Sequence, residues 1–141
     1  MAKIPFIHKI RVGWADCDPA QIAYTGRLPV FALEAIDAWW EEHIEVDWFG
    51  LNIDRNVGTP FVHLDLDFVS PVTPRHPLQC EVRLRRLGQT SITFQVIGRQ
   101  NEIECFSGNF TSVFVISDKF EKQAVPPDIR SLIEPLVINE D

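Results

Sequence analysis

Two aspartates flank a cysteine in the stretch "WADCDPAQIAYTG", residues 14–26. Asp16 and Asp18 follow an apolar, strand-like run, where partial burial makes a charged side chain costly. Two interpretations of the pair remain open. The first is a turn, because Asp accepts backbone hydrogen bonds and Pro19 stiffens a bend. The second is a partly desolvated carboxylate that acts as a general base or a nucleophile.

Other nucleophiles and metal ligands do not form a recognisable pattern. Cys17 lies between the two acids, whose charges raise the pKa of a thiol and so disfavour a reactive thiolate. The cysteines, Cys17, Cys80 and Cys105, are odd in number and lack a metal-binding spacing. The histidines are scattered at His8, His43, His63 and His76. We therefore expect no metal site.

The whole chain has the composition of an ordinary soluble globular protein. Its 141 residues predict a single domain over residues 1–141. A net charge of -7 disfavours general nucleic-acid binding, because no basic excess exists to neutralise phosphates. The N-terminus does not resemble a signal peptide, and no apolar run has a membrane-spanning length of about 18 residues. We expect a cytoplasmic protein without membrane contact.

The elements around the aspartates are predicted from hydrophobic periodicity. Residues 6–14 alternate as a strand, with Phe6, Ile10, Val12 and Trp14 on one side and Lys9 and Arg11 on the other. Residues 28–43 carry apolar side chains at helical spacing over a wide arc, which predicts a heavily buried helix. Residues 44–58 have no clean period, so we expect a loop with a short turn of helix.

Strands dominate the rest of the chain. Strict alternation predicts strands within 59–71, 78–87 and 91–99, and residues 104–117 indicate a long final strand with a bulge or bend at Gly108. Pro127 and Asp128 suggest the start of a short helix. Short connections make the late strands antiparallel. The economical arrangement is an α+β fold in which an antiparallel sheet wraps around the apolar helix.

Three stretches carry a resemblance to a known family: "DCDPAQIAY" at 16–24, the helix that follows it, and "GTPFVHLDLDFVSP" at 58–71. In this order the chain resembles the hotdog fold and, within it, acyl-CoA thioesterases of the 4-hydroxybenzoyl-CoA thioesterase type. The resemblance implies hydrolysis of an acyl-CoA to the free acid and coenzyme A, without any cofactor. It also implies a homodimer or a dimer of dimers. The expected site lies between subunits, where Asp18 of one faces the "TPFV" strand of the other.

The resemblance assigns roles to individual residues. Asp18 matches the family's catalytic carboxylate, as nucleophile or general base, whereas Asp16 is expected to be structural. The backbone N–H of Thr25 or Gly26, at the exposed start of the helix, is the expected oxyanion donor. The predicted substrate-binding residues are Tyr24, Thr25, Gly26, Thr59, Pro60, Phe61, Val62 and His63. Glu34, the first acid on the helix, is the alternative catalytic group.

Two departures from the family pattern affect binding. The family usually has a glycine where this chain has Gln21, and its phosphate-binding arginines would fall near Gly88 and Gln89. Arg85 and Arg86 are the nearest replacements, and we predict that they bind coenzyme A. Aromatic residues near the end of the helix, Trp39, Trp40, Trp48 and Phe49, are expected in the core and in part along a pocket for an aryl or medium-chain acyl group.

Two other functions remain as alternatives. A hotdog dehydratase or hydratase would need a histidine beside its acid, and the "DCDPA" stretch has none nearby. A non-catalytic module would bind an acyl group or a partner without turnover. Release of free coenzyme A distinguishes both of them from a thioesterase.

Overall fold

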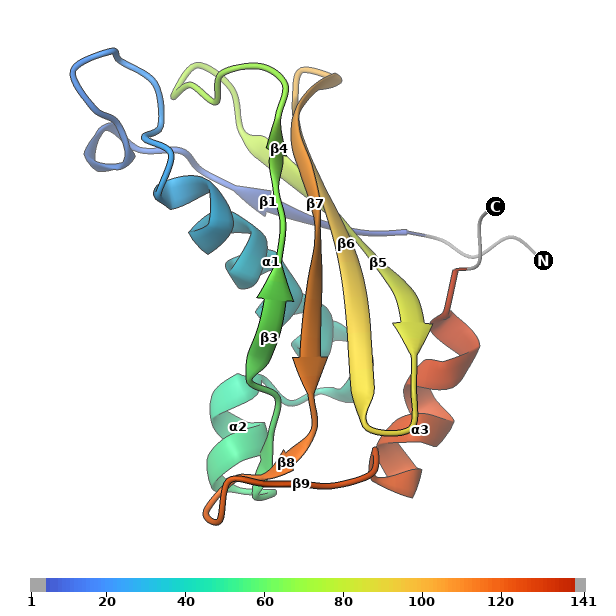
Figure 1. Ribbon diagram of the computed structural model, residues 1–141. Coiled ribbons are helices and arrows are strands. Elements are labelled where there is room, and N and C mark those ends of the chain that lie inside the picture. The colour runs from blue at the N-terminus through green and yellow to red at the C-terminus, as the bar shows by residue number, and fades with distance from the viewer. Residues whose placement is uncertain (1–4, 139–141) are drawn as a thin grey trace.

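A curved antiparallel sheet packs around one long helix in the computed structural model, which describes residues 5–138 (Figure 1). The main sheet has the strand order β1-β5-β6-β7-β3, and β4 also pairs with β7. Its strands are β1 (Phe6–Ile10), β3 (Phe61–Leu64), β4 (Asp67–Phe68), β5 (Leu78–Leu87), β6 (Ser91–Gln100) and β7 (Ile103–Val113). This arrangement confirms the predicted antiparallel sheet and central helix.

The central helix α1 (Arg27–Ile44) matches the predicted helix within one residue at each end. Its apolar face is buried as the periodicity predicted, and Ala32 and Ala35 are fully buried at the contact with the sheet. Small side chains here let the helix approach the strands closely. The helix ends at Glu45, whose φ of 60° places it in the left-handed region.

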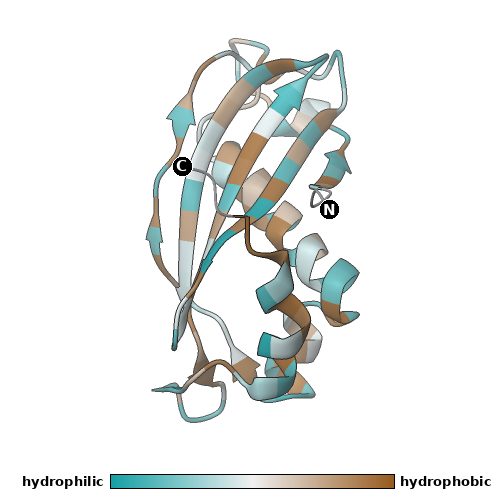
Figure 2. Cartoon of the chain, turned by 90° about the vertical axis from the view of Figure 1, so that its right-hand side faces the viewer, coloured by the Kyte–Doolittle hydropathy of each residue, from teal (hydrophilic) through white to brown (hydrophobic). Residues whose placement is uncertain are grey.

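The inner face of the sheet supplies the other half of the core. Aromatic side chains meet the helix there, and the rings of Trp39 and Phe94 lie 4.8 Å apart in an edge-to-face contact. Trp39 and Trp40 are both almost completely buried, so they belong to the core. Along the long strands, hydrophobic and hydrophilic residues alternate (Figure 2). This alternation places one face of the sheet on the helix and leaves the other polar.

Smaller elements lie at one end of the core, opposite to the loop that follows β1 (Figure 1). The predicted loop at 44–58 contains the short helix α2 (Trp48–Ile53), which Asp47 caps by accepting a hydrogen bond from the Gly50 N–H at 2.9 Å. A second sheet joins β2 (Val57–Gly58), β8 (Val115–Ile116) and β9 (Glu121–Lys122). The predicted C-terminal helix is α3 (Pro127–Ile133), followed by the 3-10 turn Glu134–Leu136. None of the helices within residues 5–138 has the length and apolarity needed to cross a bilayer.

The first strand is shorter than predicted. It ends at Ile10, opposite Leu78, because β5 begins at that residue and offers no further partner. The chain then enters the 3-10 turn Trp14–Asp16, which breaks the alternation. Trp14 was predicted to share the buried side of the strand, but it is 74% exposed.

The strand predicted over 59–71 is also interrupted. It forms the edge of the sheet as β3 and β4, with a break in which the Asp65 N–H donates to the Asn109 carbonyl at 3.0 Å. The prediction of a buried apolar side was wrong for Val62, Leu64 and Phe68, which are exposed. An edge strand has only one neighbour, so nothing within this chain covers these side chains.

Two details of the sheet differ from simple alternation. A bulge or bend was expected at Gly108, but Gly108 pairs regularly with Val96, and the register of β7 shifts at Cys105 instead. A Cβ at Gly108 would lie 1.9 Å from the Asp65 carbonyl oxygen of the edge segment. Glu81 was expected on the exposed side of β5 but is buried, with hydrogen bonds from Arg99 at 2.8 Å and Arg83 at 2.5 Å. Burial raises the pKa of the Glu81 carboxyl, but the two guanidinium groups outweigh it and hold that pKa below its usual value.

Candidate active site

Asp18 lies in a small closed loop that precedes α1. The loop is closed by a β-bridge between Cys17 and Ala23, and the Asp18 N–H donates to the Ile22 carbonyl at 3.0 Å. One carboxylate oxygen of Asp18, Oδ1, accepts from the Ala20 N–H at 2.9 Å. The side chain is thus held as an Asx turn while remaining half-buried. The turn interpretation is confirmed, and the same turn fixes the orientation of the Asp18 carboxylate. Its role as a base or nucleophile stays a prediction.

Asp16 ties this loop to the helix. Its Oδ1 accepts from the Arg27 Nε at 2.9 Å, and its Oδ2 accepts from the Gly13 N–H at 2.8 Å. Its carbonyl oxygen accepts from the Tyr24 N–H at 3.1 Å. All of these bonds are internal to the loop and the helix start, as expected for a structural residue.

The start of α1 offers backbone donors beside the loop. The carbonyl oxygens of Tyr24 and Thr25 accept hydrogen bonds from the N–H groups of the first helical residues. The N–H groups of Thr25 and Gly26 themselves donate to no residue within 5–138. They carry the positive end of the helix dipole. The ring of Tyr24 lies over this position, since a Cβ at Gly26 would come within 2.9 Å of it. These three predicted substrate residues therefore lie together at the helix start.

The predicted residues from the "TPFV" segment lie at the other end of the molecule. Figure 1 places the loop after β1 beyond one end of the edge strand and the start of β3 at the other end, beside α2. Thr59 is buried, Pro60 and Phe61 are half-buried, and Val62 and His63 are exposed. Within one chain, the structure does not bring this segment next to Asp18.

A hollow of about 370 Å³ lies at the start of β3. Three of its lining residues are aromatic, Trp48, Phe61 and Phe120, and the rings of Trp48 and Phe61 meet edge to face at 5.7 Å. The indole N–H of Trp48 is buried and has no acceptor among the described residues. Ten residues line the hollow: Leu33, Trp48, Asn52, Gly58, Thr59, Pro60, Phe61, Val115, Ser117 and Phe120. Sequence reasoning missed Asn52, Ser117 and Phe120, because they come from separate elements without a shared motif.

The predicted coenzyme A residues lie near the turn between β5 and β6. Arg85 is half-buried and donates to the Gln95 Oε1 at 3.0 Å, whereas Arg86 is exposed. This turn is at the opposite end of the sheet from the Asp18 loop in the same chain (Figure 1). The assignment of these arginines to coenzyme A stays a prediction.

The remaining candidates have other roles in this structure. Glu34 is exposed, and its Oε2 lies 3.0 Å from the Nε2 of His8. His63 is paired with Asp65 on the exposed edge, 3.1 Å from Nε2 to Oδ2. Partial burial and the charges of Asp16 and Asp18 raise the pKa of the Cys17 thiol, as the sequence indicated. Within residues 5–138, no group of three or more potential metal ligands lies together.

Known proteins share both this sequence pattern and this fold. The family model of the thioesterase-like superfamily matches residues 12–133. A crystal structure of a thioesterase superfamily protein from Jannaschia sp. CCS1 is 55% identical, covers 98% of each chain and superposes with a TM-score of 0.93. A search of curated protein sequences found no match.

More distant structures share the fold. A 1,4-dihydroxy-2-naphthoyl-CoA thioesterase from Synechocystis is 18% identical, with 94% of this chain and 97% of that chain covered and a TM-score of 0.83. A DHNA-CoA thioesterase from Staphylococcus aureus is 10% identical, with 93% and 89% covered and a TM-score of 0.84. These likenesses confirm the α+β hotdog fold. Together with the match over residues 12–133, they establish that the chain belongs to the thioesterase-like superfamily.

Proposed function

We propose that this protein hydrolyses an aryl- or medium-chain acyl-CoA to the free acid and coenzyme A, with chemistry of the 4-hydroxybenzoyl-CoA thioesterase type. The observation that carries the proposal is the half-buried carboxylate of Asp18, fixed by its own turn in the loop that leads through Ala23 into the unbonded N–H groups of Thr25 and Gly26. Thioester hydrolysis needs both parts. A base or nucleophile must reach the carbonyl carbon, and donors must stabilise the oxyanion that forms.

Asp18 has two routes through this reaction. It attacks the thioester carbon to form a mixed anhydride and expel the coenzyme A thiolate, after which water cleaves the anhydride. Alternatively, it takes a proton from the water that attacks the same carbon. In both routes the carbonyl oxygen becomes negative beside the helix start, where one backbone donor is worth roughly 3–4 kcal/mol of the barrier. No metal or redox cofactor takes part.

A second copy of the chain completes the site in this proposal. The edge strand β3 carries exposed apolar side chains at Val62 and Leu64, and its outer backbone groups have no neighbouring strand within residues 5–138. Two copies could pair antiparallel along β3, about a two-fold axis. The start of β3 in one copy would then lie beside the end of β3 in the other. Asp18 of one copy then faces Thr59 and Phe61 of the other. The assembly is a homodimer, or a dimer of such dimers.

The hollow beside Phe61 suits the acyl group. Its aromatic wall favours a flat or medium-length apolar chain. The rings of Trp48 and Phe61 offer flat surfaces against which an aryl group can pack, so aryl groups are the preferred class. Tyr24 and His63 would border the entrance from the two copies.

The test is release of free thiol from a panel of benzoyl-, 4-hydroxybenzoyl-, hexanoyl- and octanoyl-CoA. Asp18→Asn should fold normally and lower kcat by about 10²- to 10⁴-fold, the usual loss for a missing general base or nucleophile. Glu41→Gln, which neutralises an exposed acid on α1, is the matched control and should keep the parent rate. Parent-level turnover by Asp18→Asn would remove Asp18 from the mechanism. Absence of coenzyme A release across the panel would favour the acyl-binding or dehydratase alternatives.

The assembly is tested separately by sedimentation. Val62→Lys places a charge on the exposed edge and should give monomers that have lost hydrolysis. Ile103→Lys changes an equally exposed apolar residue away from β3 and should leave both properties intact. A Val62→Lys protein that stays dimeric and active would contradict pairing along this edge.

A further inference from the structure

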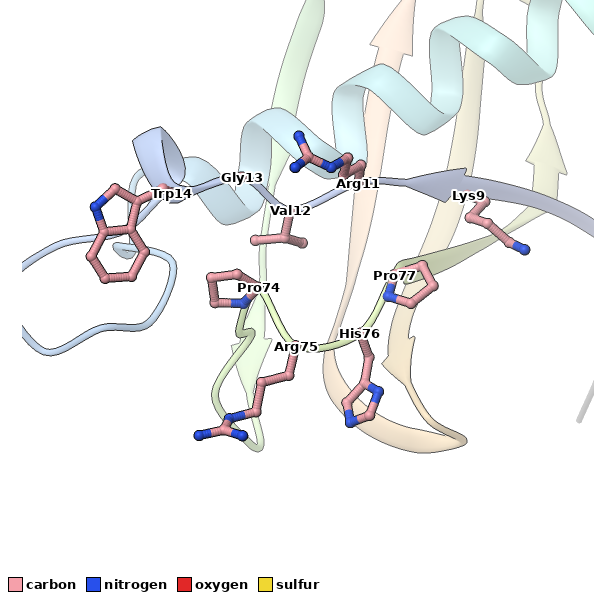
Figure 3. A pocket seen from close by; sticks show the side chains of 9 residues that line it. All are labelled: Lys9, Arg11, Val12, Gly13, Trp14, Pro74, Arg75, His76 and Pro77. Carbon is pink, nitrogen blue, oxygen red and sulfur yellow. The ribbon is translucent and has the colours of Figure 1, made fainter.

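A second and larger hollow, of about 560 Å³, lies between the end of β1 and the loop at 74–77. Figure 3 shows its two sides: Val12 and Pro74 face one another across the middle, and Pro77 lies below Lys9 at one end. These apolar groups form the floor. Lys9, Arg11 and Arg75 also line the hollow. In Figure 3 Lys9 lies at the end beside Pro77, the Arg11 side chain is directed away from the loop at 74–77, and the Arg75 side chain is directed away from β1. We call this site the basic groove.

The charge of the basic groove is unusual for this chain. The chain as a whole has a net charge of -7, yet no acidic residue lines the groove. Lys9, Arg11 and Arg75 are exposed, and none of them forms an ion pair with another residue of the described part. By contrast, Arg27 and Arg99 are paired with carboxylates. Three unpaired cations around one hollow create a local positive potential that attracts anions.

An aromatic ring closes one end of the groove. Trp14 lies on the 3-10 turn after β1 and is 74% exposed, so its indole face is available to a flat ligand. Cations beside an exposed indole suit a nucleotide, because its phosphates can bind the cations while its base stacks on the ring.

The groove is also next to the candidate active site. Trp14 begins the turn that leads directly into the Asp18 loop. From the other side of the groove, Val72 precedes the loop at 74–77, and its carbonyl accepts from the Ala23 N–H of the Asp18 loop at 2.8 Å. We propose that the basic groove binds the nucleotide of coenzyme A, with Arg11, Arg75 and Lys9 on its phosphates and its adenine against Trp14. The identity of the ligand rests on the proposed function; the anion site itself does not.

This placement differs from the one predicted for Arg85 and Arg86, and the two can be separated. Arg85 donates to Gln95. Both arginines lie at the end of the sheet opposite to the Asp18 loop of the same chain, so they could approach that loop only from the second copy of the proposed dimer. The groove contains more cations, an aromatic face and an apolar floor in one place. An acidic carrier protein would need a broad basic surface, whereas these cations surround a single hollow. The geometry therefore favours a small phosphorylated ligand.

The first experiment measures binding of adenosine 3′,5′-bisphosphate, which carries the base and a phosphate of coenzyme A, by calorimetry at low and high salt. The parent should bind it, more weakly at high salt. Arg11→Ala/Arg75→Ala should raise Kd by about 5-fold or more, as expected for two lost charge contacts. Lys119→Ala/Lys122→Ala removes two exposed cations elsewhere and serves as the control. Trp14→Ala should weaken binding without changing its salt dependence.

The second experiment compares hydrolysis of an acyl-CoA with that of the same acyl group on pantetheine, which lacks the nucleotide. The Arg11→Ala/Arg75→Ala protein should have a raised KM for the acyl-CoA, an unchanged kcat, and parent-level kinetics with the acyl-pantetheine. An equal rise in KM for both substrates would overturn the proposal. So would parent-level nucleotide binding by this variant, loss of binding only in Arg86→Ala, or a defect confined to acyl groups on a carrier protein.

The two proposals can fail independently. A parent protein that binds the bisphosphate in the groove but hydrolyses no thioester leaves the groove as a nucleotide site and removes the proposed activity. A parent protein that hydrolyses acyl-CoA and acyl-pantetheine with the same KM, and does not bind the bisphosphate, keeps the activity and removes the groove.

Discussion

Arg27 and Asp16 form an ion pair, 2.9 Å from Nε to Oδ1, that joins the first residue of α1 to the turn before Asp18. The Asp16 side chain is only 16% exposed, and the Arg27 guanidinium also lies 5.0 Å from the centre of the Phe31 ring. The pair therefore fixes the loop to the helix and the helix to the core. In the proposed mechanism Asp18 and the helix N–H groups act on the same carbonyl, so their relative position would depend on this contact.

Arg27→Met should reveal that dependence. The substitution keeps an apolar side chain over Phe31 but leaves the Asp16 carboxylate partly buried without its cation. We expect the free energy of unfolding to fall by about 1–2 kcal/mol. We also expect kcat for thioester hydrolysis to fall by about 10-fold, because the carboxylate loses its fixed position. Denaturant unfolding and thiol release measure the two effects. Arg27→Lys should be intermediate, and an unchanged kcat in Arg27→Met would show that the pair has no part in positioning.

Gly26→Ala tests the packing of Tyr24 against the helix start. The backbone at Gly26 has an ordinary helical φ of -66°, so the new methyl group causes no backbone strain. It would instead come within 2.9 Å of the Tyr24 ring and displace it. We expect the melting temperature to change little and KM for the acyl-CoA to rise several-fold. In a Tyr24→Ala background the same substitution should have no further effect, and an additive loss would contradict the contact.

Gln21 adopts a left-handed conformation, with a φ of 70°, in the loop that holds Asp18. This conformation costs a residue with a side chain roughly 1–2 kcal/mol, whereas glycine adopts it freely. Gln21→Gly should raise the free energy of unfolding by about 0.5–1 kcal/mol, because the added freedom of the unfolded chain offsets part of the gain. Gln21→Ala keeps the strain and is the control. Equal stability of the two variants, measured in urea, would contradict this explanation.

His43 makes stability depend on pH. Burial against Trp39 and Phe6 lowers the pKa of its imidazole, and the neighbouring Glu42 opposes this only partly. The unfolded chain takes up a proton near the ordinary pKa of 6.5, whereas the folded chain does so only at lower pH. Between these two values the unfolded state binds more protons, so stability is lost as the pH falls through 6.5.

The measurement is the free energy of unfolding of the parent and of His43→Gln across this pH range. The parent should lose more stability on acidification than the variant. His76→Gln changes an exposed histidine and serves as the control. Parallel curves for the parent and His43→Gln would assign the pH dependence to other groups.

The regular elements could be predicted because their residues bury one face each. α1 was predicted within one residue at both ends, and β5 with the same bounds, since the apolar positions of each have a clear period. The wrong predictions concern strand segments that have no neighbouring strand to pair with over their full length. β1 stops where β5 begins, and the edge segment at 61–68 breaks where Asp65 turns toward β7. Periodicity within one segment carries no information about the length of its partner.

The candidate site shows the same division. The proximity of the Asp18 loop to the helix start at Thr25 and Gly26 could be predicted, because the two segments are adjacent in sequence. The roles of these residues stay predictions. The basic groove could not, because Arg11 and Arg75 are far apart along the chain and meet only when β1 pairs with β5. The resemblance indicated a glycine at position 21, and the positive φ of Gln21 is the physical reason for that preference.

The close approach of Asp65 to Gly108 also limits how this chain can aggregate. It ends the free ladder of β3 after four residues, Phe61–Leu64. Amyloid-like stacking needs about six or seven residues of continuous, weakly charged strand. The opposite edge, β1, is five residues long and includes the charged Lys9. Head-to-tail growth into fibres would thus join two short edges of unequal length, whereas a two-fold pair is closed and covers the β3 edge of both copies.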